Sequence, residues 1–184
     1  MSIRTGSSAI RPGKHTYGLD GCSVHAWERR GDVIQMGSYC SLGANIKFVI
    51  DGNHRTDTFS SYPFQRLFVG APVNVWGKET PTVGHDVWIA SDVVIYSGVH
   101  IGDGAVIGGN SVVTKPVPPY AIVAGNPARI VKYRFPEDVI ADLLALKWWT
   151  LPEDVIHARL IPIQDDIREV VRVLKELRAV SAPE

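Results

Sequence analysis

A repeat of six residues runs through the middle of the chain and limits the folds that it can adopt. Read from Val83, the sequence divides into the hexads VGHDVW, IASDVV, IYSGVH, IGDGAV, IGGNSV and VTKPVP. A helix needs apolar residues three and four apart, whereas Val or Ile at every sixth position, with Gly, Asp and Asn recurring between, predicts short strands joined by tight turns. Stacked turns of this kind bury a continuous aliphatic column, so the repeat predicts a parallel β-helix.

An earlier and weaker copy of the repeat precedes a long interruption. In MGSYCSLGANIKFVI, Met36, Leu42 and Phe48 lie six residues apart, and the segment from about 51 to 80 then breaks the count with a histidine, several hydroxyls and several aromatic rings. Regular coils supply a rigid wall and only an excursion can reach over a cleft, so we expect this loop to carry functional residues. Upstream of Met36 we expect a loosely structured start that caps the first coil.

The pattern changes after residue 135. PEDVIADLLALKWW, from Pro136, has the apolar spacing of a helix and acidic residues in its first turn. Thr150 and Glu153 form a capping-box pattern for a short second helix, and QDDIREVVRVLKELRAV predicts a third helix with one apolar face. We therefore divide the chain into a β-helix domain, residues 1–135, and a helical extension, residues 136–184.

The composition narrows the classes of partner. Nineteen basic and nineteen acidic residues cancel, which does not favour a nucleic-acid partner. No apolar stretch approaches the roughly 18 residues needed to cross a bilayer, and we expect no signal peptide. Cys22 and Cys40 lack the CxxC spacing of a metal or redox site. We therefore expect a cytoplasmic protein with reduced cysteines and no membrane span.

His54 is the first candidate for chemistry. It lies in the loop with Asp57 nearby, and a histidine close to a carboxylate can act as a general base. A lone loop histidine is more often merely solvated, so the local pattern leaves both interpretations open.

A short basic cluster is the second candidate. Arg129, Lys132 and Arg134 lie within six residues that contain no acid, with Lys115 upstream. Such a cluster can neutralise the phosphates of a nucleotide-like cofactor, although a short charge run is commonly an ordinary solvated face. The six histidines of the chain lack the short-range pairing of a zinc site, so we expect no metal.

Several segments together resemble one known family. MGSYCSLGANI, GNHRTDTFSSYPF, the hexads, the AGNPA that follows them and the LLALKWW near the end are similar to the xenobiotic branch of the hexapeptide-repeat acyltransferases, which includes the streptogramin and type B chloramphenicol acetyltransferases. The resemblance implies a left-handed parallel β-helix with a protruding loop. It also implies a homotrimer that holds acetyl-CoA in the cleft between neighbouring subunits.

The resemblance also implies roles for individual residues. His54 would remove the proton from an acceptor hydroxyl, which then attacks the thioester directly without a covalent acyl-enzyme. The acceptor side would include Tyr39, Asp57, Tyr62 and Phe64, with Asp57 able to orient either His54 or the acceptor. The pantetheine arm of acetyl-CoA would lie beside Trp88, Gly108 and Ala124. The phosphates of acetyl-CoA would contact Lys115, Arg129, Lys132 and Arg134.

The sequence therefore predicts an acetyl-CoA-dependent O-acetyltransferase that acts on a hydroxyl of a small molecule, either an antibiotic-like compound or a sugar. Three alternatives stay open. The acceptor can be the amine of an amino sugar, the chain can be a non-catalytic scaffold subunit, or it can be a γ-type carbonic anhydrase, which the absent zinc-ligand spacing disfavours. No general rule converts RTDTFSSYPF into one acceptor.

Overall fold

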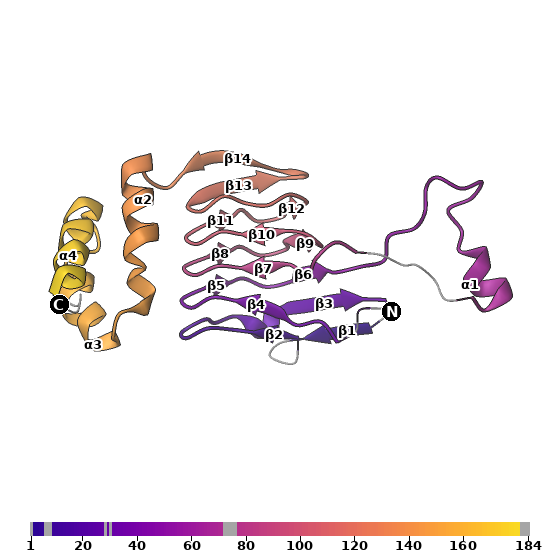
Figure 1. Ribbon diagram of the computed structural model, residues 1–184, viewed down its shortest axis with the longest axis horizontal. Coiled ribbons are helices and arrows are strands. Elements are labelled where there is room, and N and C mark those ends of the chain that lie inside the picture. Colours follow the sequence, from indigo (N-terminus) through magenta and orange to yellow (C-terminus); the bar gives the residue numbers. More distant parts are fainter. Residues whose placement is uncertain (1, 6–8, 28, 30, 72–76, 181–184) are drawn as a thin grey trace. The chain divides into compact units, whose positions relative to one another are not determined.

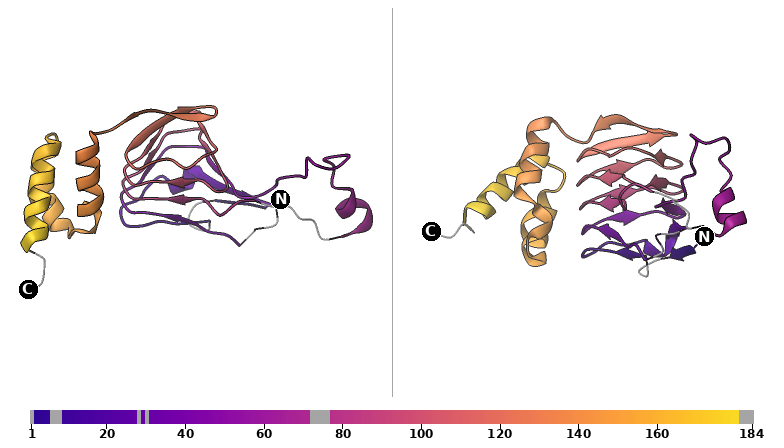
Figure 2. Two further views of the ribbon diagram at one scale, coloured as in Figure 1. Left: turned by 45° about the horizontal axis from the view of Figure 1, so that its top comes forward. Right: turned by 45° about the vertical axis from the view of Figure 1, so that its right-hand side comes forward.

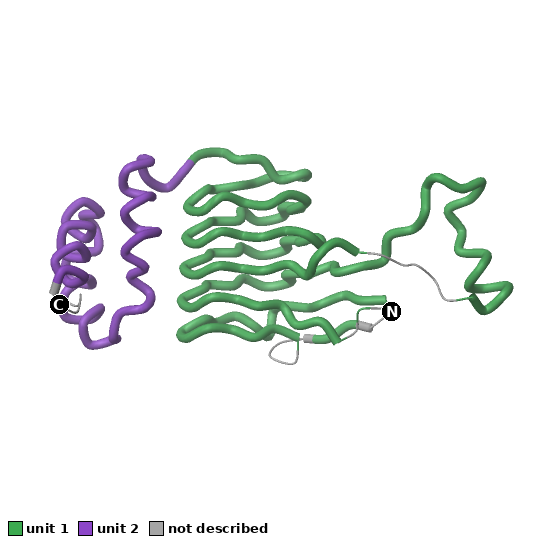
Figure 3. The backbone as a smooth tube through the Cα atoms, in the orientation of Figure 1, with its two compact units in different colours: residues 1–132 green, residues 133–184 purple. Residues whose placement is uncertain are grey.

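The computed structural model describes residues 2–5, 9–27, 29, 31–71 and 77–180 (Figure 1). The chain divides into two compact units, Met1–Lys132 and Tyr133–Glu184 (Figure 3). The first unit contains the coil of strands and the loop, and the second contains the C-terminal helices. The division into a β-helix domain, residues 1–135, and a helical extension, residues 136–184, stays a prediction.

The strands of the first unit are short, as the hexads require. In chain order they are β1 (Ser2–Thr5), β2 (Ile10–Arg11), β3 (Cys22–Ala26), β4 (Ile34–Met36), β5 (Ser41–Leu42), β6 (Ile46–Val49), β7 (Thr82–Val83), β8 (Trp88–Ile89), β9 (Val94–Tyr96), β10 (His100–Ile101), β11 (Val106–Ile107), β12 (Val112–Val113), β13 (Ala121–Gly125) and β14 (Ala128–Tyr133). The same unit contains a turn of 3-10 helix, η2 (Leu19–Gly21), and one short helix, α1 (Phe64–Val69).

These strands form three sheets that the chain visits in rotation. The strand orders are β1-β3-β6-β9-β12, β10-β7-β4-β2 and β14-β13-β11-β8-β5, and successive coils stack on one another (Figure 1). The pairings that join β2 through β13 are parallel, while β1 runs antiparallel to β3. The predicted coil of parallel strands is confirmed. The predicted loose start is wrong, because β2 and β3 are already strands of the coil.

The register locates the interruption in the coil. Within the regular coils, Val83 lies opposite Ile101, 18 residues later. Across the loop, Phe48 lies opposite Ile95, 47 residues later, in the same parallel arrangement. The stacking therefore continues undisturbed past the loop, which is added to one coil as an excursion.

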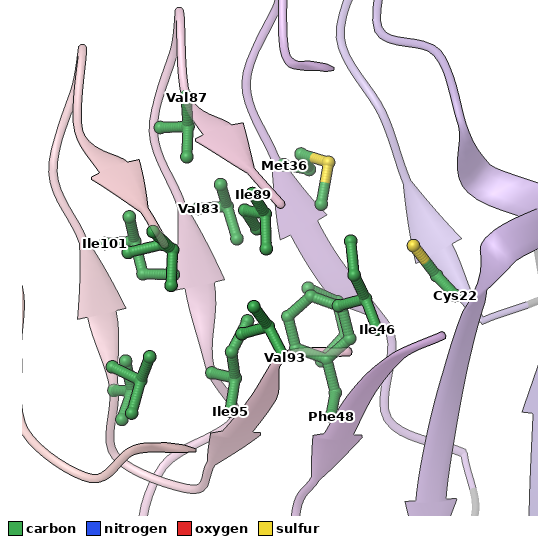
Figure 4. Packing of buried hydrophobic residues seen from close by; sticks show 14 of the residues in the cluster. Cys22, Met36, Ile46, Phe48, Val83, Val87, Ile89, Val93, Ile95 and Ile101 are labelled. Carbon is green, nitrogen blue, oxygen red and sulfur yellow. The ribbon is translucent and has the colours of Figure 1, made fainter. Parts of the chain in front are cut away.

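The core is the aliphatic column inside the coil. The first and fifth positions of the hexads are all buried: Val83, Val87, Ile89, Val93, Ile95, Val99, Ile101, Ala105, Ile107, Ser111, Val113 and Val117. Figure 4 shows Phe48 of the weaker copy beside Ile95 in this interior. Ser111 is the polar exception, and its hydroxyl accepts a hydrogen bond from the Gly125 backbone N–H at 3.1 Å.

The corners of the coil use the left-handed backbone conformation. Positive φ angles occur at the fourth position of five successive hexads: Asp86 (56°), Asp92 (62°), Gly98 (75°), Gly104 (69°) and Asn110 (57°). Glycine, asparagine and aspartate adopt this conformation at low cost, which explains why these residue types recur there. Tyr39 occupies the matching corner of the weaker copy with φ 62°.

The second unit is helical. Its elements are α2 (Glu137–Leu146), η3 (Trp148–Thr150), α3 (Glu153–Val155), the π-helical turn η4 (Ile156–Leu160), η5 (Ile161–Ile163) and α4 (Ile167–Val180). Helices α2 and α4 pack side by side (Figure 2) and bury Leu143 and Leu174. The predicted capping box is wrong, because α3 begins after Pro152 and the Thr150 hydroxyl donates to the Lys147 carbonyl at 2.8 Å.

Candidate active site

A cavity of about 500 Å³ lies between the loop that joins β6 to β7 and Trp27, which follows β3. It is lined by Trp27, Asn53, His54, Arg55, Thr58, Phe59, Ser60, Ser61, Tyr62, Pro63, Phe64, Gln65 and Arg66. Aromatic rings, hydroxyls and a histidine thus meet at one place, as a binding site for a small organic molecule requires.

A backbone carbonyl fixes the orientation of the His54 ring. Nδ1 of His54 lies 2.8 Å from the carbonyl oxygen of Ser61. A carbonyl oxygen can only accept a hydrogen bond, so Nδ1 carries the hydrogen and donates it. Nε2 of the neutral ring is then the nitrogen with the lone pair, and it can accept a proton from a ligand.

The predicted acceptor-side aromatics form one cluster. Tyr62 and Phe64 meet edge to face with ring centroids 4.8 Å apart, and Phe64 also contacts Phe59 at 5.6 Å and Phe68 at 5.4 Å. Each of these rings is at least 40% exposed, and Phe59 is 93% exposed. The cluster is therefore an apolar surface that is open to a ligand or to another protein surface.

The predicted role of Asp57 in orienting His54 meets a competing contact. Both carboxylate oxygens of Asp57 accept hydrogen bonds from Arg55, at 2.9 and 2.7 Å. These bonds hold the pKa of the Asp57 carboxyl below its usual value. The Ser61 carbonyl, rather than this carboxylate, is the group that contacts Nδ1 of His54.

Two of the predicted site residues lie on the coil outside the cavity lining. The Tyr39 ring stacks on His15 with centroids 5.0 Å apart, at the corner where both residues have positive φ. Trp88 is on β8 and is 54% exposed. The structure of one chain therefore does not bring Tyr39 or Trp88 to His54.

The residues predicted beside acetyl-CoA form two groups. Gly108 and Ala124 are neighbours on adjacent coils, since a Cβ at Gly108 would lie 3.0 Å from that of Ala124. Of the basic residues, Lys115, Arg129 and Lys132 are exposed in the first unit. Arg134 belongs to the second unit, and its guanidinium lies 5.2 Å from the centre of the Phe135 ring.

The residue-level predictions did not include Trp27, Asp51 or the backbone contact of Ser61 with His54. Trp27 lines the cavity, Ser61 orients His54 through its backbone, and Asp51 is buried at the start of the loop. A signal for Trp27 exists in the register, because Cys22 to His25 pair with Ile46 to Val49 at an offset of 24 residues. Extending that offset places Trp27 beside Asp51.

Other site classes find no support in the described part of the chain. No group of three or more His, Cys, Asp or Glu side chains there is arranged to hold a metal ion. Among the same residues, no helix is long and apolar enough to cross a membrane.

Comparison with known proteins identifies relatives over most of the chain. The family model "Bacterial transferase hexapeptide (six repeats)" matches residues 80–115. A probable macrolide acetyltransferase from Lysinibacillus sphaericus is 42% identical over 68% of this chain and 73% of its own length. A chloramphenicol acetyltransferase from Agrobacterium fabrum is 39% identical over 78% of this chain and 73% of its own length.

A solved structure agrees with these relatives. It is a hexapeptide-repeat acetyltransferase from Vibrio cholerae in complex with acetyl coenzyme A, with a TM-score of 0.56 and 30% identity. The match covers 70% of this chain and 62% of that one, so this chain spans less than two thirds of that structure. The repeat, the three-sided coil and these relatives place the chain in the hexapeptide-repeat acetyltransferases, within the branch that acetylates xenobiotics.

Proposed function

We propose that this acetyltransferase moves the acetyl group of acetyl-CoA to a hydroxyl of an antibiotic-like small molecule, with His54 as the general base. The observation that carries the proposal is the hydrogen bond between Nδ1 of His54 and the Ser61 carbonyl, because it leaves Nε2 as a proton acceptor in an aromatic cavity. The relatives named as macrolide and chloramphenicol acetyltransferases support the acceptor class.

The reaction needs a base because an alcohol is a weak nucleophile at neutral pH. Nε2 of His54 takes the hydroxyl proton while the oxygen attacks the thioester carbonyl carbon. The carbon–sulfur bond then breaks, and the coenzyme A sulfur leaves and receives the proton from the imidazolium. A positioned base of this kind contributes about 10²- to 10⁴-fold to the rate. No acyl-enzyme is formed.

For acetyl-CoA we propose the outer edge of the coil that carries Trp88, Gly108 and Ala124. Gly108 and Ala124 present little side-chain bulk, so a narrow pantetheine arm can lie close to the backbone there. Trp88 is exposed and supplies an apolar ring. The phosphates would pair with Lys115, Arg129 and Lys132, since Arg and Lys are the usual phosphate partners. A role of Arg134, which belongs to the second unit, stays a prediction from the sequence.

We propose that the working protein is a homotrimer of left-handed β-helices, with each active site between two subunits. The observation that supports an assembly is the apolar surface of the loop, where Phe59 is 93%, Phe68 73% and Val69 73% exposed. Acetyl-CoA on one subunit would then face the loop of the neighbouring subunit. This arrangement would explain why Trp88 and His54 do not meet within one chain. The free thiols of Cys22 and Cys40 support a reducing, cytoplasmic setting.

The test is release of free coenzyme A from acetyl-CoA against a panel of hydroxylated antibiotics, sugars and amino sugars. The proposal predicts release with an antibiotic-like alcohol and a product whose added mass is one acetyl group in an alkali-labile ester. An amide product would replace the hydroxyl acceptor by an amine. Failure of the chain to bind coenzyme A by calorimetry would favour a non-catalytic scaffold.

A further inference from the structure

We propose that Asp51 and Arg29 are positioning residues that clamp both ends of the loop to the coil and so set the direction in which His54 leaves it. The loop-base clamp comprises Asp51, Arg29, Asp32 and Thr80. The proposal rests on the proposed role of His54, and it adds the groups that place this base without touching either substrate.

Asp51 holds the outgoing end of the loop. Asp51 is 4% exposed, and no other charged residue in the described part of the chain is buried. Oδ1 accepts a hydrogen bond from the backbone N–H of Trp27 at 2.7 Å, and Oδ2 accepts one from that of Arg29 at 2.8 Å. A buried carboxylate needs such donors, and bonds to a charged acceptor are short and strong. The backbone three residues before His54 is therefore fixed.

The same carboxylate places one wall of the cavity. Trp27, whose backbone Asp51 holds, lines the cavity together with His54. Its ring lies against Gly52, since a Cβ at Gly52 would come within 2.8 Å of Cε3 of the ring, and Gly52 has φ 107°. Gly52 thus permits the close approach, and Asp51 sets Trp27 and the start of the His54 segment together.

Arg29 holds the returning end of the loop. Its guanidinium donates to the backbone carbonyl of Lys78 and, at 2.5 Å, to the hydroxyl of Thr80. It also forms an ion pair with Asp32 at 2.5 Å, and the Thr80 hydroxyl donates to the same Asp32 carboxylate. The planar guanidinium can satisfy these acceptors at once, which a lysine ammonium at the end of a flexible chain does less well.

The two ends also touch directly. A Cβ at Gly77 would lie 2.0 Å from the Ile50 carbonyl oxygen and 3.0 Å from Cα of Asp51. The Asp51 carboxylate therefore holds the backbone of Arg29, and the side chain of Arg29 in turn holds the returning end of the loop. Loss of either contact releases one end of the loop while the aliphatic column of the coil stays intact.

The clamp predicts a specific kinetic signature. Displacing a catalytic group by about 1 Å can lower a rate about 100-fold, so release of the loop should lower kcat with the acceptor. The KM for acetyl-CoA should change little, because the proposed coenzyme surface is on the coil. A merely structural role would instead lower thermal stability and leave the kcat of the folded enzyme unchanged.

The experiment compares Asp51→Asn and Arg29→Lys with Asp92→Asn. Asp92 is a matched control because its Oδ1 also accepts a hydrogen bond, from Nδ2 of Asn45 at 3.1 Å, but at an exposed corner away from the loop. Initial rates are measured with each substrate varied, and the ligand-free proteins are digested with trypsin, which cleaves after Arg55 and Arg66 in the exposed loop.

We expect kcat to fall about 10- to 100-fold in both clamp variants, with the KM for acetyl-CoA within about twofold, and faster cleavage after Arg55 and Arg66. The control should match the wild type in both assays. Wild-type kcat in both clamp variants, with or without faster cleavage, would overturn the proposal. The Arg29 side chain is 33% exposed, so we expect Arg29→Lys to fold. This variant tests the clamp even if Asp51→Asn does not fold. If the wild type acetylates no acceptor, the proposed function fails. Cleavage rates in both clamp variants equal to that of the wild type would separately refute the clamp.

Discussion

Replacing Gly77 with alanine should disable the enzyme while leaving the coil folded. The new Cβ would lie 2.0 Å from the Ile50 carbonyl oxygen, whereas Cβ atoms essentially never approach other heavy atoms within 3.0 Å. The backbone of the returning loop must therefore move by about 1 Å or more. A movement of this size at a catalytic group costs about 100-fold in rate, while the overpacking itself costs about 1–3 kcal/mol of unfolding free energy.

The assay measures kcat/KM by coenzyme A release and thermal unfolding by circular dichroism. Gly31→Ala is the control, because a Cβ at Gly31 meets no heavy atom within 4 Å. We expect Gly77→Ala to lose about two orders of magnitude in kcat/KM and Gly31→Ala to retain the wild-type value. Wild-type activity in Gly77→Ala would refute the reasoning that the loop ends are closely packed and that their position controls the reaction.

Three further predictions test the coil, its thiols and the helical unit. Phe48→Ala should lower the unfolding free energy by about 3–5 kcal/mol in denaturant titrations, because the ring is fully buried in the column; a loss below about 1 kcal/mol would contradict this packing. Burial raises the pKa of the Cys22 thiol to about 11, so iodoacetamide should label it at pH 8 only after unfolding, and rapid labelling of the native protein would argue against the burial. Hydrogen bonds from arginines lower the pKa of Asp138 and of Glu169. Their contribution to stability is therefore fully present above the ordinary carboxyl pKa and is lost as the pH falls through the lowered pKa of the folded state. Helical signal from the C-terminal unit should therefore melt at lower temperature at pH 3 than at pH 6, and equal melting temperatures would contradict these pairings.

Much of the fold could be predicted from the hexads, for a physical reason. Residues such as Ile89 and Ile95 recur every six positions because the first residue on each side of a coil points into the column, and Asp92 or Gly98 recurs where each corner needs a left-handed backbone. The six-residue pattern did not predict the strands before Met36. The lower coils pair at an offset of 24 residues rather than 18, so their period is not visible as a run of hexads.

The candidate site was only partly predictable, because its decisive contacts use backbone atoms. The aromatic cluster around Tyr62 and Phe64 follows from a sequence rich in rings. The partner of His54, however, is the carbonyl of Ser61 and not a side chain. No residue type encodes that contact, and the nearby carboxylate of Asp57 is instead held by Arg55. Likewise, the importance of Asp51 follows from two backbone donors 24 and 22 residues away.

The proposed reaction depends most on His54 as the base, and His54→Asn tests this role directly. His157→Asn serves as the control, since His157 is an exposed histidine of the C-terminal unit. The measurement is kcat for coenzyme A release with a confirmed acceptor, alongside the oligomeric mass and melting temperature of each variant. We expect His54→Asn to lose about 10²- to 10⁴-fold in kcat, with an unchanged oligomeric mass and melting temperature. A kcat within about twofold of the wild type would contradict general-base catalysis by this residue.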